Sequence, residues 1–315
     1  MEGIRVGLVI PVFNVEKTIR KVLERVETTL LADDFEILII DNHSSDDTLP
    51  IIYRCLAESP ALATHVTLIQ HSANYGYGCS IKAGFEYFCE RDVTHVMVIH
   101  GDHQVDPAWL IGRLLDPIKT QPAADLVLGS RFERESSIEN YSLLRRLGNY
   151  FFNAVTTFCS GHKMSDSGTA MIIVRRDVLN RIPFHKLSNT WQFHPQLNIL
   201  LFETPGIRTE EIAMDWADSD AKSTVPLFRY GMLLLKMLTS YWAKKNLLSM
   251  SPADIFTAEP VPFDRRFRMI AAAADGALVQ ETAIAGSLRV FDPSQETDAR
   301  EIAPDKFVGT ERKAA

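Results

Sequence analysis

The chain has 315 residues, of which 46% are apolar and 23% charged, and its formal net charge is −7 at pH 7. This composition is typical of a soluble globular protein with one large domain, or one domain plus an extension. The acidic balance argues against nucleic acid as a partner, because phosphate backbones attract basic surfaces. The four cysteines have neither CxxC spacing nor the density of a disulfide scaffold, which favours a reducing compartment.

Strand-like and helical patterns alternate through the first half of the chain. Continuous apolar runs predict strands that are covered on both faces, and apolar residues at helical spacing predict the helices between them. The strands are expected at 6–10, 35–40, 66–70, 95–99 and 125–128, and the helices at 17–31, 48–57 and 76–90. This alternation predicts an α/β fold with a mostly parallel sheet and helices on both faces. No apolar run has the length of a signal peptide or of a membrane span.

The segment His100–Pro107 follows the fourth predicted strand directly. A carboxylate at the carboxyl end of a parallel strand points into the crevice where open α/β sheets bind ligands. Asp102, with the amide of Gln104 two residues on, therefore forms a candidate oxygen-ligand cluster for Mg²⁺ or Mn²⁺. The alternative is an ordinary strand-to-helix loop in which Asp106 helps to start the helix.

The second half of the chain continues the alternation less regularly. Helices are expected at 141–158 and 192–202 and strands at 169–174 and 207–216. The amphipathic segment 225–242, with Lys244 and Lys245 beyond it, either lies in a membrane interface (225–245) or covers the domain core. After Met250 prolines interrupt the pattern, and a short helix at 271–278 and a strand at 286–291 are the only expected elements. We expect a domain at 1–245 and an extension of unknown role at 246–315.

Four motifs in order resemble those of the inverting family 2 glycosyltransferases with the GT-A fold. They are Ile10–Glu16, Ile40–Thr48, Asn74–Gly78 followed by Lys82–Gly84, and Gly129–Arg131. The resemblance covers about residues 4–240. Within the family, the chain resembles the dolichyl- or polyprenyl-phosphate sugar synthases and related bacterial enzymes of surface-polysaccharide assembly.

The resemblance implies a nucleotide-sugar donor site built from the loops after the strands. Its candidate residues are Pro11, Asn14, Glu16, Asp41, Asn74, Gly76, Lys82 and Arg131, with Arg146 and Lys222 as further cations. Several have an ordinary structural alternative. Asp41 could instead close an Asx-turn and Glu16 could help a helix start, while Arg146 and Lys222 could be solvated surface charges.

The resemblance also places Asp102 at the second, metal-binding carboxylate of the family's Asp-x-Asp motif. The first carboxylate is replaced here by His100, which removes one negative charge beside the cation and the diphosphate. Imidazole ligates Mn²⁺ better than Mg²⁺, so the metal preference is expected to shift.

On the acceptor side, Met164–Thr169 resembles the family's Asp-x-Gly loop. Asp166 in this loop is a candidate general base for a hydroxyl acceptor, and His194 falls where relatives often place an acidic residue. A phosphate acceptor needs no base. Many lipid-phosphate relatives carry an arginine a few residues after the glycine of this loop, where Ala170 and Met171 stand here.

Together these features predict a cytoplasmic, metal-dependent glycosyltransferase, peripheral at the inner membrane if the 225–245 helix lies on lipid. Its expected partners are a nucleotide-sugar donor and a glycan or lipid-phosphate acceptor, and a homo-oligomer is left open. The rival hypothesis is a catalytically silent nucleotide-sugar-binding scaffold, which His100 supports and the retained Asp41, Asp102, Arg131 and Asp166 oppose. The identity of the nucleotide and of the sugar is left open.

Overall fold

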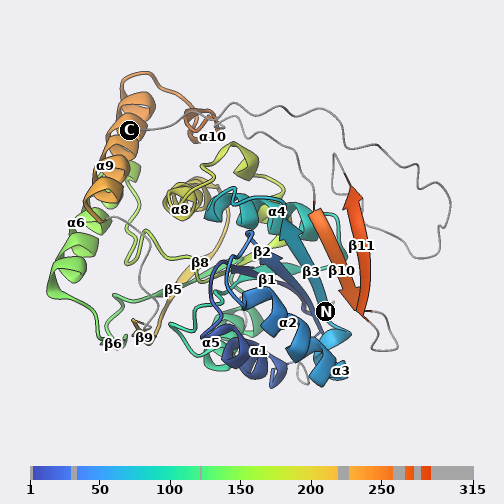
Figure 1. Ribbon diagram of the computed structural model, residues 1–315. Helices are drawn as coiled ribbons and strands as arrows, with labels where there is room; N and C mark the ends of the chain where they lie inside the picture. Colours follow the sequence, from blue (N-terminus) through green and yellow to red (C-terminus); the bar gives the residue numbers. More distant parts are fainter. Residues whose placement is uncertain are drawn as a thin grey trace, which may run out of the picture.

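The computed structural model describes residues 3–29, 34–120, 123–218, 227–257, 267–272 and 278–284. Within these residues, nine strands form one sheet in the order β11-β10-β3-β2-β1-β4-β7-β5-β8 (Figure 1). The strands are β1 (Arg5–Val12), β2 (Asp34–Asp41), β3 (Val66–His71), β4 (His95–Val98), β5 (Leu126–Ser130), β7 (Ile172–Arg175), β8 (Thr209–Ala213), β10 (Phe267–Ala272) and β11 (Leu278–Ile284). The short strands β6 (Ile138–Glu139) and β9 (Trp216–Ala217) pair in parallel beside this sheet.

The sheet is mostly parallel, as the sequence predicts. β3, β2, β1 and β4 pair in parallel, and β5 pairs in parallel with β8. β7 lies antiparallel between β4 and β5, and β10 lies antiparallel to β3. Because β7 runs backwards, the loop that precedes it lies at the edge where its two neighbours end.

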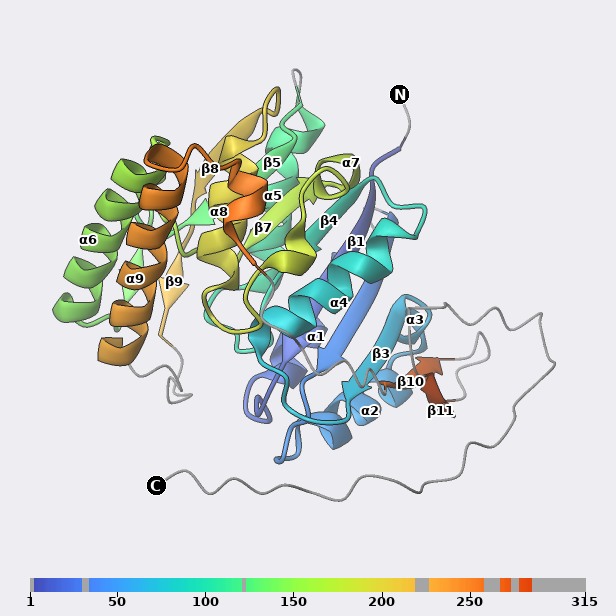
Figure 2. The same cartoon turned by 90° about the horizontal axis from the view of Figure 1, so that it is seen from above.

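Helices cover both faces of the sheet (Figures 1 and 2). They are α1 (Ile19–Glu27), α2 (Thr48–Glu58), α3 (Pro60–Ala63), α4 (Tyr77–Cys89), α5 (Pro107–Lys119), α6 (Leu143–Ser160), α7 (Arg176–Leu179), α8 (Phe193–Glu203), α9 (Leu227–Asn246) and α10 (Pro252–Ile255), with a 3-10 turn at Phe184–Lys186. Alternate residues of β1 enter two separate cores, since Leu8 packs with α1, α2 and α5 and Val9 packs with α4, α8 and α9. This two-sided burial explains why the strands are apolar throughout.

Three sequence predictions about elements need correction. The strand expected at 169–174 is β7 at Ile172–Arg175, since Thr169 turns its side chain to the Gly129 carbonyl instead. The strand expected at 207–216 is split into β8 and β9. The helix expected at 271–278 is wrong at both of its ends, because Ala271 and Ala272 belong to β10 and Leu278 begins β11. The strand expected at 286–291 lies outside the described residues.

The helices α6 and α9 lie side by side at the end of the molecule opposite to β10 and β11 (Figures 1 and 2). Phe158 of α6 stacks on Trp242 of α9, with ring centroids 6.4 Å apart. Among the described helices, none combines the length and the hydropathy needed to cross a membrane. The four cysteines of the sequence are free thiols, which agrees with the absence of a disulfide pattern.

Candidate active site

The carboxyl ends of the parallel strands form one polar edge of the sheet. In the register of the sheet Val12 lies opposite Asp41, and Asp41 lies opposite Gln70, so the carboxyl ends of β1, β2 and β3 are neighbours. β4 pairs in parallel with β1, which brings the loop at 99–106 to the same edge. Open α/β sheets bind ligands in the crevice outside the carboxyl ends of their strands. This edge is therefore the candidate site.

The loops after β1 and β2 are bonded to each other. Pro11 is buried within β1. Asn14 has a φ of 53°, and its Oδ1 accepts a hydrogen bond from the Ser45 amide at 2.8 Å. Glu16 Oε2 accepts from the Asp47 amide at 3.2 Å, at the start of α2. Of the two roles expected for Glu16, the structure shows a contact at a helix start, although the helix is α2 and not α1.

Asp41 ends β2 and is fully buried. Its Oδ1 accepts hydrogen bonds from the amide of Ser44 at 3.1 Å and from the Ser44 hydroxyl at 2.5 Å, and its Oδ2 accepts from Gln70 Nε2 at 3.0 Å. These contacts are of the turn type that the structural alternative for Asp41 anticipates. An ionised carboxylate offers about four acceptor positions, so Asp41 keeps little capacity for a nucleotide group.

Asn74 and Gly76 shape the loop between β3 and α4. Asn74 Oδ1 accepts hydrogen bonds from Asn42 Nδ2 and from the Gly76 amide, both at 2.9 Å. Gly76 has a φ of 92°, and a Cβ atom there would lie 2.4 Å from the Asn189 carbonyl oxygen. Glycine is therefore required at position 76 by the backbone conformation and by the close approach of the 187–193 segment.

Lys82 is buried on α4 and holds the same segment. Its ammonium group donates to the Leu187 carbonyl and, at 3.0 Å, to Asn189 Oδ1. A Cβ atom at Gly78 would lie 2.3 Å from the Ser188 carbonyl oxygen, so the contact between α4 and this segment is tight. The structure thus places Lys82 in the packing between α4 and the 187–193 segment.

A chain of three aromatic side chains lies beneath the loop after β4. The Tyr77 hydroxyl is 2.8 Å from His100 Nε2 and also 2.8 Å from His194 Nε2. One hydroxyl can donate to only one of the two nitrogens, so it accepts from the other, and the two imidazoles take different tautomers. Burial lowers the pKa of His100 and, more strongly, that of His194, and it raises the pKa of Tyr77 well above 10. All three groups are therefore neutral near pH 7.

The sequence points to His194 and to the His100 replacement but not to Tyr77, which joins them. His194 is 117 residues from Tyr77, and its Nδ1 is buried without a hydrogen-bond partner among the described residues. His100 contacts Tyr77 through Nε2, so Nδ1 is the ring nitrogen that remains for another partner. A tyrosine in the first turn of a helix that follows a glycine-rich loop is the only sequence signal for this contact.

The buried neutral histidines predict a loss of stability in acid. Burial lowers the pKa of His95 to about 4 and holds that of His194 well below 6.5. Between these values and about 6.5 the unfolded chain binds protons that the folded chain does not. Above pH 6.5 these histidines therefore cost the fold no stability. As the pH falls below 6.5, each of them lowers the free energy of unfolding by up to about 1.4 kcal/mol per pH unit.

Urea unfolding at several pH values between 7.5 and 5 tests this expectation. The matched variants His95→Gln and His194→Gln should each have a shallower pH dependence than the wild type. An exposed histidine, His185, serves as the control, since His185→Gln should retain the full slope. Equal slopes for all four proteins would contradict the assignment.

Asp102 has few partners in the described part of the chain. Its Oδ1 accepts one long hydrogen bond, 3.5 Å from the Gln104 amide, and its side chain is only partly buried. Gln104 Nε2 donates to Asp218 Oδ1 at 3.1 Å, which leaves the amide oxygen of Gln104 unbonded among the described residues. The structural alternative for this loop also holds in part, because Asp106 caps α5 by accepting from the Trp109 amide at 2.9 Å. Capping by Asp106 leaves Asp102 free to bind a ligand.

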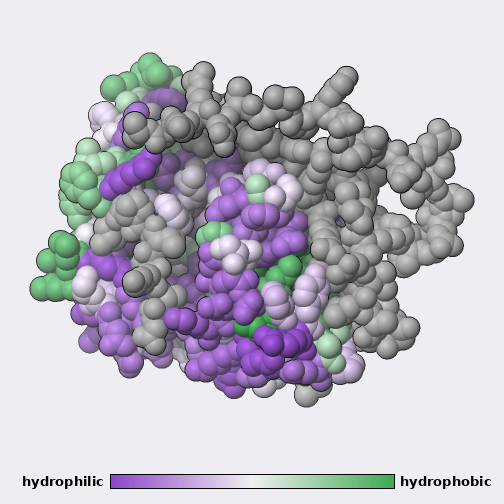
Figure 3. Space-filling view, viewed as in Figure 1, coloured by the Kyte–Doolittle hydropathy of each residue, from purple (hydrophilic) through white to green (hydrophobic). Residues whose placement is uncertain are grey.

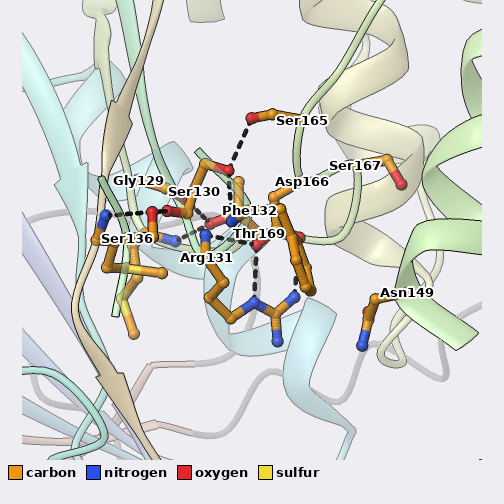
Figure 4. Close-up of polar contacts among 12 residues, drawn as sticks. Gly129, Ser130, Arg131, Phe132, Ser136, Asn149, Ser165, Asp166, Ser167 and Thr169 are labelled. Atoms are coloured by element: carbon orange, nitrogen blue, oxygen red, sulfur yellow. Dashed lines mark hydrogen bonds and ion pairs between the residues drawn. The ribbon is translucent and has the colours of Figure 1, made fainter. Parts of the chain in front are cut away.

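Arg131 and Asp166 form a buried ion pair at the end of β5 (Figure 4). Arg131 Nε donates to Asp166 Oδ2 at 2.7 Å and Nη2 donates to Oδ1 at 2.8 Å, while the side chain of Asp166 is 0% exposed. Burial by itself lowers the pKa of Arg131, but the Asp166 carboxylate outweighs burial and keeps the pKa above its ordinary value. Both oxygens of Asp166 accept from the guanidinium, so this carboxylate is poorly placed to remove a proton from an acceptor.

The loop that carries Asp166 is held by polar side chains that the sequence analysis missed. The Ser165 hydroxyl donates to Glu211 Oε1 at 2.8 Å and lies 2.7 Å from Ser130 Oγ, from which it can accept (Figure 4 shows the contact with Ser130). Asn153 of α6 bonds Ser165 and Ser167, and Asn198 of α8 donates to the carbonyls of Ser167 and Thr169 at 3.0 Å. Polar residues in the middle of two otherwise apolar helices are the signal that could have revealed this support.

Of the two weaker cation candidates, Arg146 is the one that the structure describes. It lies on α6, where Nη2 donates to the Ile138 carbonyl at 3.4 Å, and Nε is buried with no hydrogen-bond partner in the part of the chain that the structure describes. Its neighbour Arg145 forms an ion pair with Asp218, the residue that also holds Gln104. Lys222 lies outside the described residues.

Comparison with known proteins gives a consistent result. The family model described as "Glycosyl transferase family 2" matches residues 8–182. Among curated proteins, the undecaprenyl-phosphate 4-deoxy-4-formamido-L-arabinose transferases of Klebsiella pneumoniae (strain 342) and Photorhabdus laumondii are 31% identical over 180 residues and 29% identical over 177 residues. Each match covers 56% of this chain and 50% of the relative, so the chain spans about half the length of these curated relatives.

Solved structures agree on the fold. Glucosyl-3-phosphoglycerate synthase from Mycobacterium tuberculosis in complex with Mn²⁺, UDP-glucose and phosphoglyceric acid superposes with a TM-score of 0.56 at 15% identity, covering 77% of this chain and 80% of that one. The same enzyme with Mn²⁺, UDP and phosphoglyceric acid covers 91% of this chain and 89% of that one, with a TM-score of 0.54 at 15% identity. At this identity the likeness shows the fold alone.

Proposed function

The chain belongs to glycosyl transferase family 2, and from that premise we propose that it is a metal-dependent, inverting glycosyltransferase. It moves a sugar from a nucleotide-sugar donor to a polyprenyl-phosphate acceptor in bacterial surface glycan assembly. The observation that carries the proposal is the Asp102 carboxylate at the carboxyl edge of the sheet, which is nearly free of partners among the described residues. Asp102 and Arg131 both act electrostatically on the pKa of His100, which burial lowers, so both charges lie within electrostatic reach of this ring.

The donor atoms at this place fit a hard divalent cation. Among the described residues, no group of three or more His, Cys, Asp or Glu side chains could hold a metal by itself. Mg²⁺ commonly binds through one or two carboxylates together with substrate phosphates and waters. Asp102 supplies the carboxylate, and the oxygen of Gln104 and Nδ1 of His100 are the neighbouring ligand candidates. A cation held there would stabilise the charge that develops on the leaving diphosphate, an effect of several kcal/mol.

Other residues at this edge of the sheet are expected to bind the donor and to orient it. The bonded loops of Asn14, Glu16 and Asp41 form the wall where the nucleoside is expected to lie. Arg131 keeps Nη1 outside its pair with Asp166, and this nitrogen is available to a phosphate oxygen. The 187–193 segment, fixed by Lys82, leads into α8, and we expect His194 at the start of this helix to lie on the sugar side of the site.

The side chains on the acceptor side favour a phosphate acceptor over a hydroxyl acceptor. A hydroxyl acceptor needs a general base, yet Asp166 gives both oxygens to Arg131, and His194 is buried with Nε2 at Tyr77. A lipid phosphate is already ionised at neutral pH and needs no base. The names of the undecaprenyl-phosphate relatives support the same choice. The missing arginine after Gly168 is the sequence feature against it.

Direct assay tests the proposed function. A thermal-shift screen of UDP-, GDP-, CDP- and dTDP-sugars with and without Mn²⁺ should identify a donor, because a ligand that binds the folded form raises the melting temperature. The selected donor is then incubated with a short-chain polyprenyl phosphate or with a glycan that offers only hydroxyl groups. Transfer to the phosphate alone supports the proposal, and transfer to the glycan alone contradicts the acceptor assignment.

A catalytically silent scaffold is the second candidate, and the replacement at His100 favours it. It predicts metal-dependent donor binding without transfer to either acceptor and without donor hydrolysis. Measurable release of nucleoside diphosphate from the bound donor would exclude it.

The His100 replacement itself predicts an altered metal preference. Because imidazole ligates Mn²⁺ better than Mg²⁺, the wild type should bind nucleoside diphosphate more tightly with Mn²⁺. His100→Asp supplies a second carboxylate and should lower the ratio of Mn²⁺-supported to Mg²⁺-supported affinity by about tenfold. Calorimetric titration with each metal measures the ratio. His100→Phe separates loss of the imidazole from gain of the carboxylate, and an unchanged ratio in His100→Asp would show that His100 does not face the cation.

A further inference from the structure

The helix α6 has its polarity reversed with respect to an ordinary surface helix. Its inward side carries the buried polar residues Asn153, Thr156 and Ser160 beside Cys159, with Phe152 and Val155 packed against the core. Its outward side carries large apolar side chains that are 50–76% exposed, namely Leu143, Leu144, Leu147, Tyr150, Phe151 and Phe158. A helix at the surface of a soluble domain normally turns its apolar stripe to the core. Tyr150 packs on Phe132 and Phe158 stacks on Trp242, yet each residue of the outward stripe stays at least half exposed, so most of its apolar surface faces away from the described chain.

The neighbouring helix α9 continues the same exposed surface. Its inward stripe, Leu234, Leu238 and Tyr241, is buried, while Phe228 is 85% and Met232 55% exposed. Apolar side chains gather over α6 and α9 on the face shown in Figure 3. We call the exposed apolar residues of α6 together with Phe228, Met232 and Leu233 the α6–α9 face. Contiguous apolar surface of this kind marks an interaction site.

The charge on these two helices has one sign. Leu143–Ser160 and Leu227–Asn246 contain six Lys or Arg residues and no Asp or Glu, although the chain as a whole has a net charge of −7. Arg229 and Lys236 are exposed and, within the described residues, have no acidic partner. They are seven residues apart, about two helical turns, on the side of α9 that carries Phe228 and Met232.

We infer that the α6–α9 face is a docking surface for an anionic phospholipid bilayer. Exposed large apolar side chains interleaved with unpaired cations suit the boundary between acyl chains and negatively charged headgroups. A second copy of the chain fits less well, because a two-fold contact through this face would bring like charges together. The described helices offer no membrane span, so the contact lies in the plane of the bilayer surface.

The face adjoins the acceptor side of the candidate site. The Tyr230 hydroxyl lies 3.5 Å from the Trp191 carbonyl oxygen, in the segment that leads to His194. Arg131 and Asp166 both affect the pKa of Tyr230, which burial raises to about 12. If the proposed function holds, a bilayer on the α6–α9 face delivers a lipid-linked acceptor at this end of the site. Lipid binding itself does not depend on that function.

Vesicle sedimentation of the full chain tests the inference. The wild type should pellet with vesicles of phosphatidylcholine mixed with phosphatidylglycerol, and much less with phosphatidylcholine alone. Arg229→Gln with Lys236→Gln should lower the partition coefficient about tenfold at low salt, because each cation near an anionic surface contributes to binding. Phe228→Ser with Met232→Ser should lower binding at both low and high salt, since burial of apolar side chains is not screened.

Lys21→Gln with Arg54→Gln, on α1 and α2, removes the same charge away from the face and should leave binding unchanged. Thermal unfolding of each variant verifies that it is folded. Failure of the wild type to pellet with anionic vesicles would overturn the inference, as would equal loss in the α1–α2 control. A dimer in sedimentation velocity that Phe228→Ser with Met232→Ser dissociates, without vesicle binding by the wild type, would assign the face to a second copy instead.

Discussion

Asp102→Ala is expected to abolish the gain in nucleoside-diphosphate affinity that Mn²⁺ or Mg²⁺ provides. Within the described residues the Asp102 carboxylate accepts one long hydrogen bond, so its removal should cost the fold little. It is the acidic group available to a cation at the carboxyl end of β4. Loss of several kcal/mol of charge stabilisation corresponds to about a thousandfold slower sugar transfer.

Calorimetric titration of the donor's nucleoside diphosphate with Mn²⁺ and with EDTA measures the binding part of this effect. The wild type should bind more tightly with Mn²⁺, whereas Asp102→Ala should bind equally weakly in both buffers. Asp92→Ala is the matched control, because Asp92 precedes β4 at the opposite edge of the sheet and its side chain is 85% exposed. Metal-dependent binding of the same size in wild type and Asp102→Ala would remove Asp102 from the role proposed for it.

Arg131→Met is expected to destabilise the fold more than the loss of an exposed arginine or lysine does. It leaves the Asp166 carboxylate, whose side chain is 0% exposed, without its bidentate partner. An unpaired buried charge costs about 3–5 kcal/mol, which for a domain of this size lowers the melting temperature by roughly 10 °C. Thermal and urea unfolding measure the loss.

A second bidentate pair provides the control. Arg25 donates through Nε and Nη2 to Asp106 at 2.8 and 3.0 Å, but the two side chains are 43% and 38% exposed. Solvent screens an exposed pair, so Arg25→Met should lower the melting temperature far less than Arg131→Met. The double change Arg131→Met with Asp166→Leu should recover much of the loss, since it removes the unpaired charge. A similar loss in Arg25→Met and Arg131→Met would show that burial of the Asp166 pair is not the cause.

The strands and the location of the site follow from local pattern. Runs such as Ile37–Ile40 are apolar at every position because β2 is covered on both faces, and this predicts a central parallel strand. Polar residues that directly follow such runs, Asp41 and Asp102 among them, meet at one edge because parallel strands end together. The fold class and the candidate edge are therefore predictable from residues that are near neighbours in the chain.

The contacts made across that edge are not predictable in the same way. Tyr77 meets partners 23 and 117 residues away, and no spacing rule joins them. Lys82 carries the positive charge of a typical phosphate ligand, yet the 187–193 segment packs against it and buries it. Tertiary packing decides whether a charged group in a loop motif faces the ligand or the core.

The tail shows tertiary packing overriding local preference. The alanine-rich stretch at 271–274 favours a helix, but Ala271 pairs with Thr67 as part of β10. The free edge of β3 offers unpaired backbone groups, and their pairing outweighs the modest helix preference of alanine. Likewise, the polar residues of α6 face inward because the Asp166 loop needs hydrogen-bond partners there.

The central claim is that Asp102 holds a divalent cation against the diphosphate of a nucleotide-sugar donor. The most direct test is anomalous scattering from a crystal of the protein soaked with Mn²⁺ and the nucleoside diphosphate selected in the thermal-shift screen. We expect an anomalous peak within bonding distance of an Asp102 carboxylate oxygen and of a diphosphate oxygen. Bound nucleotide at the strand ends with the manganese peak absent or on other side chains would contradict the account.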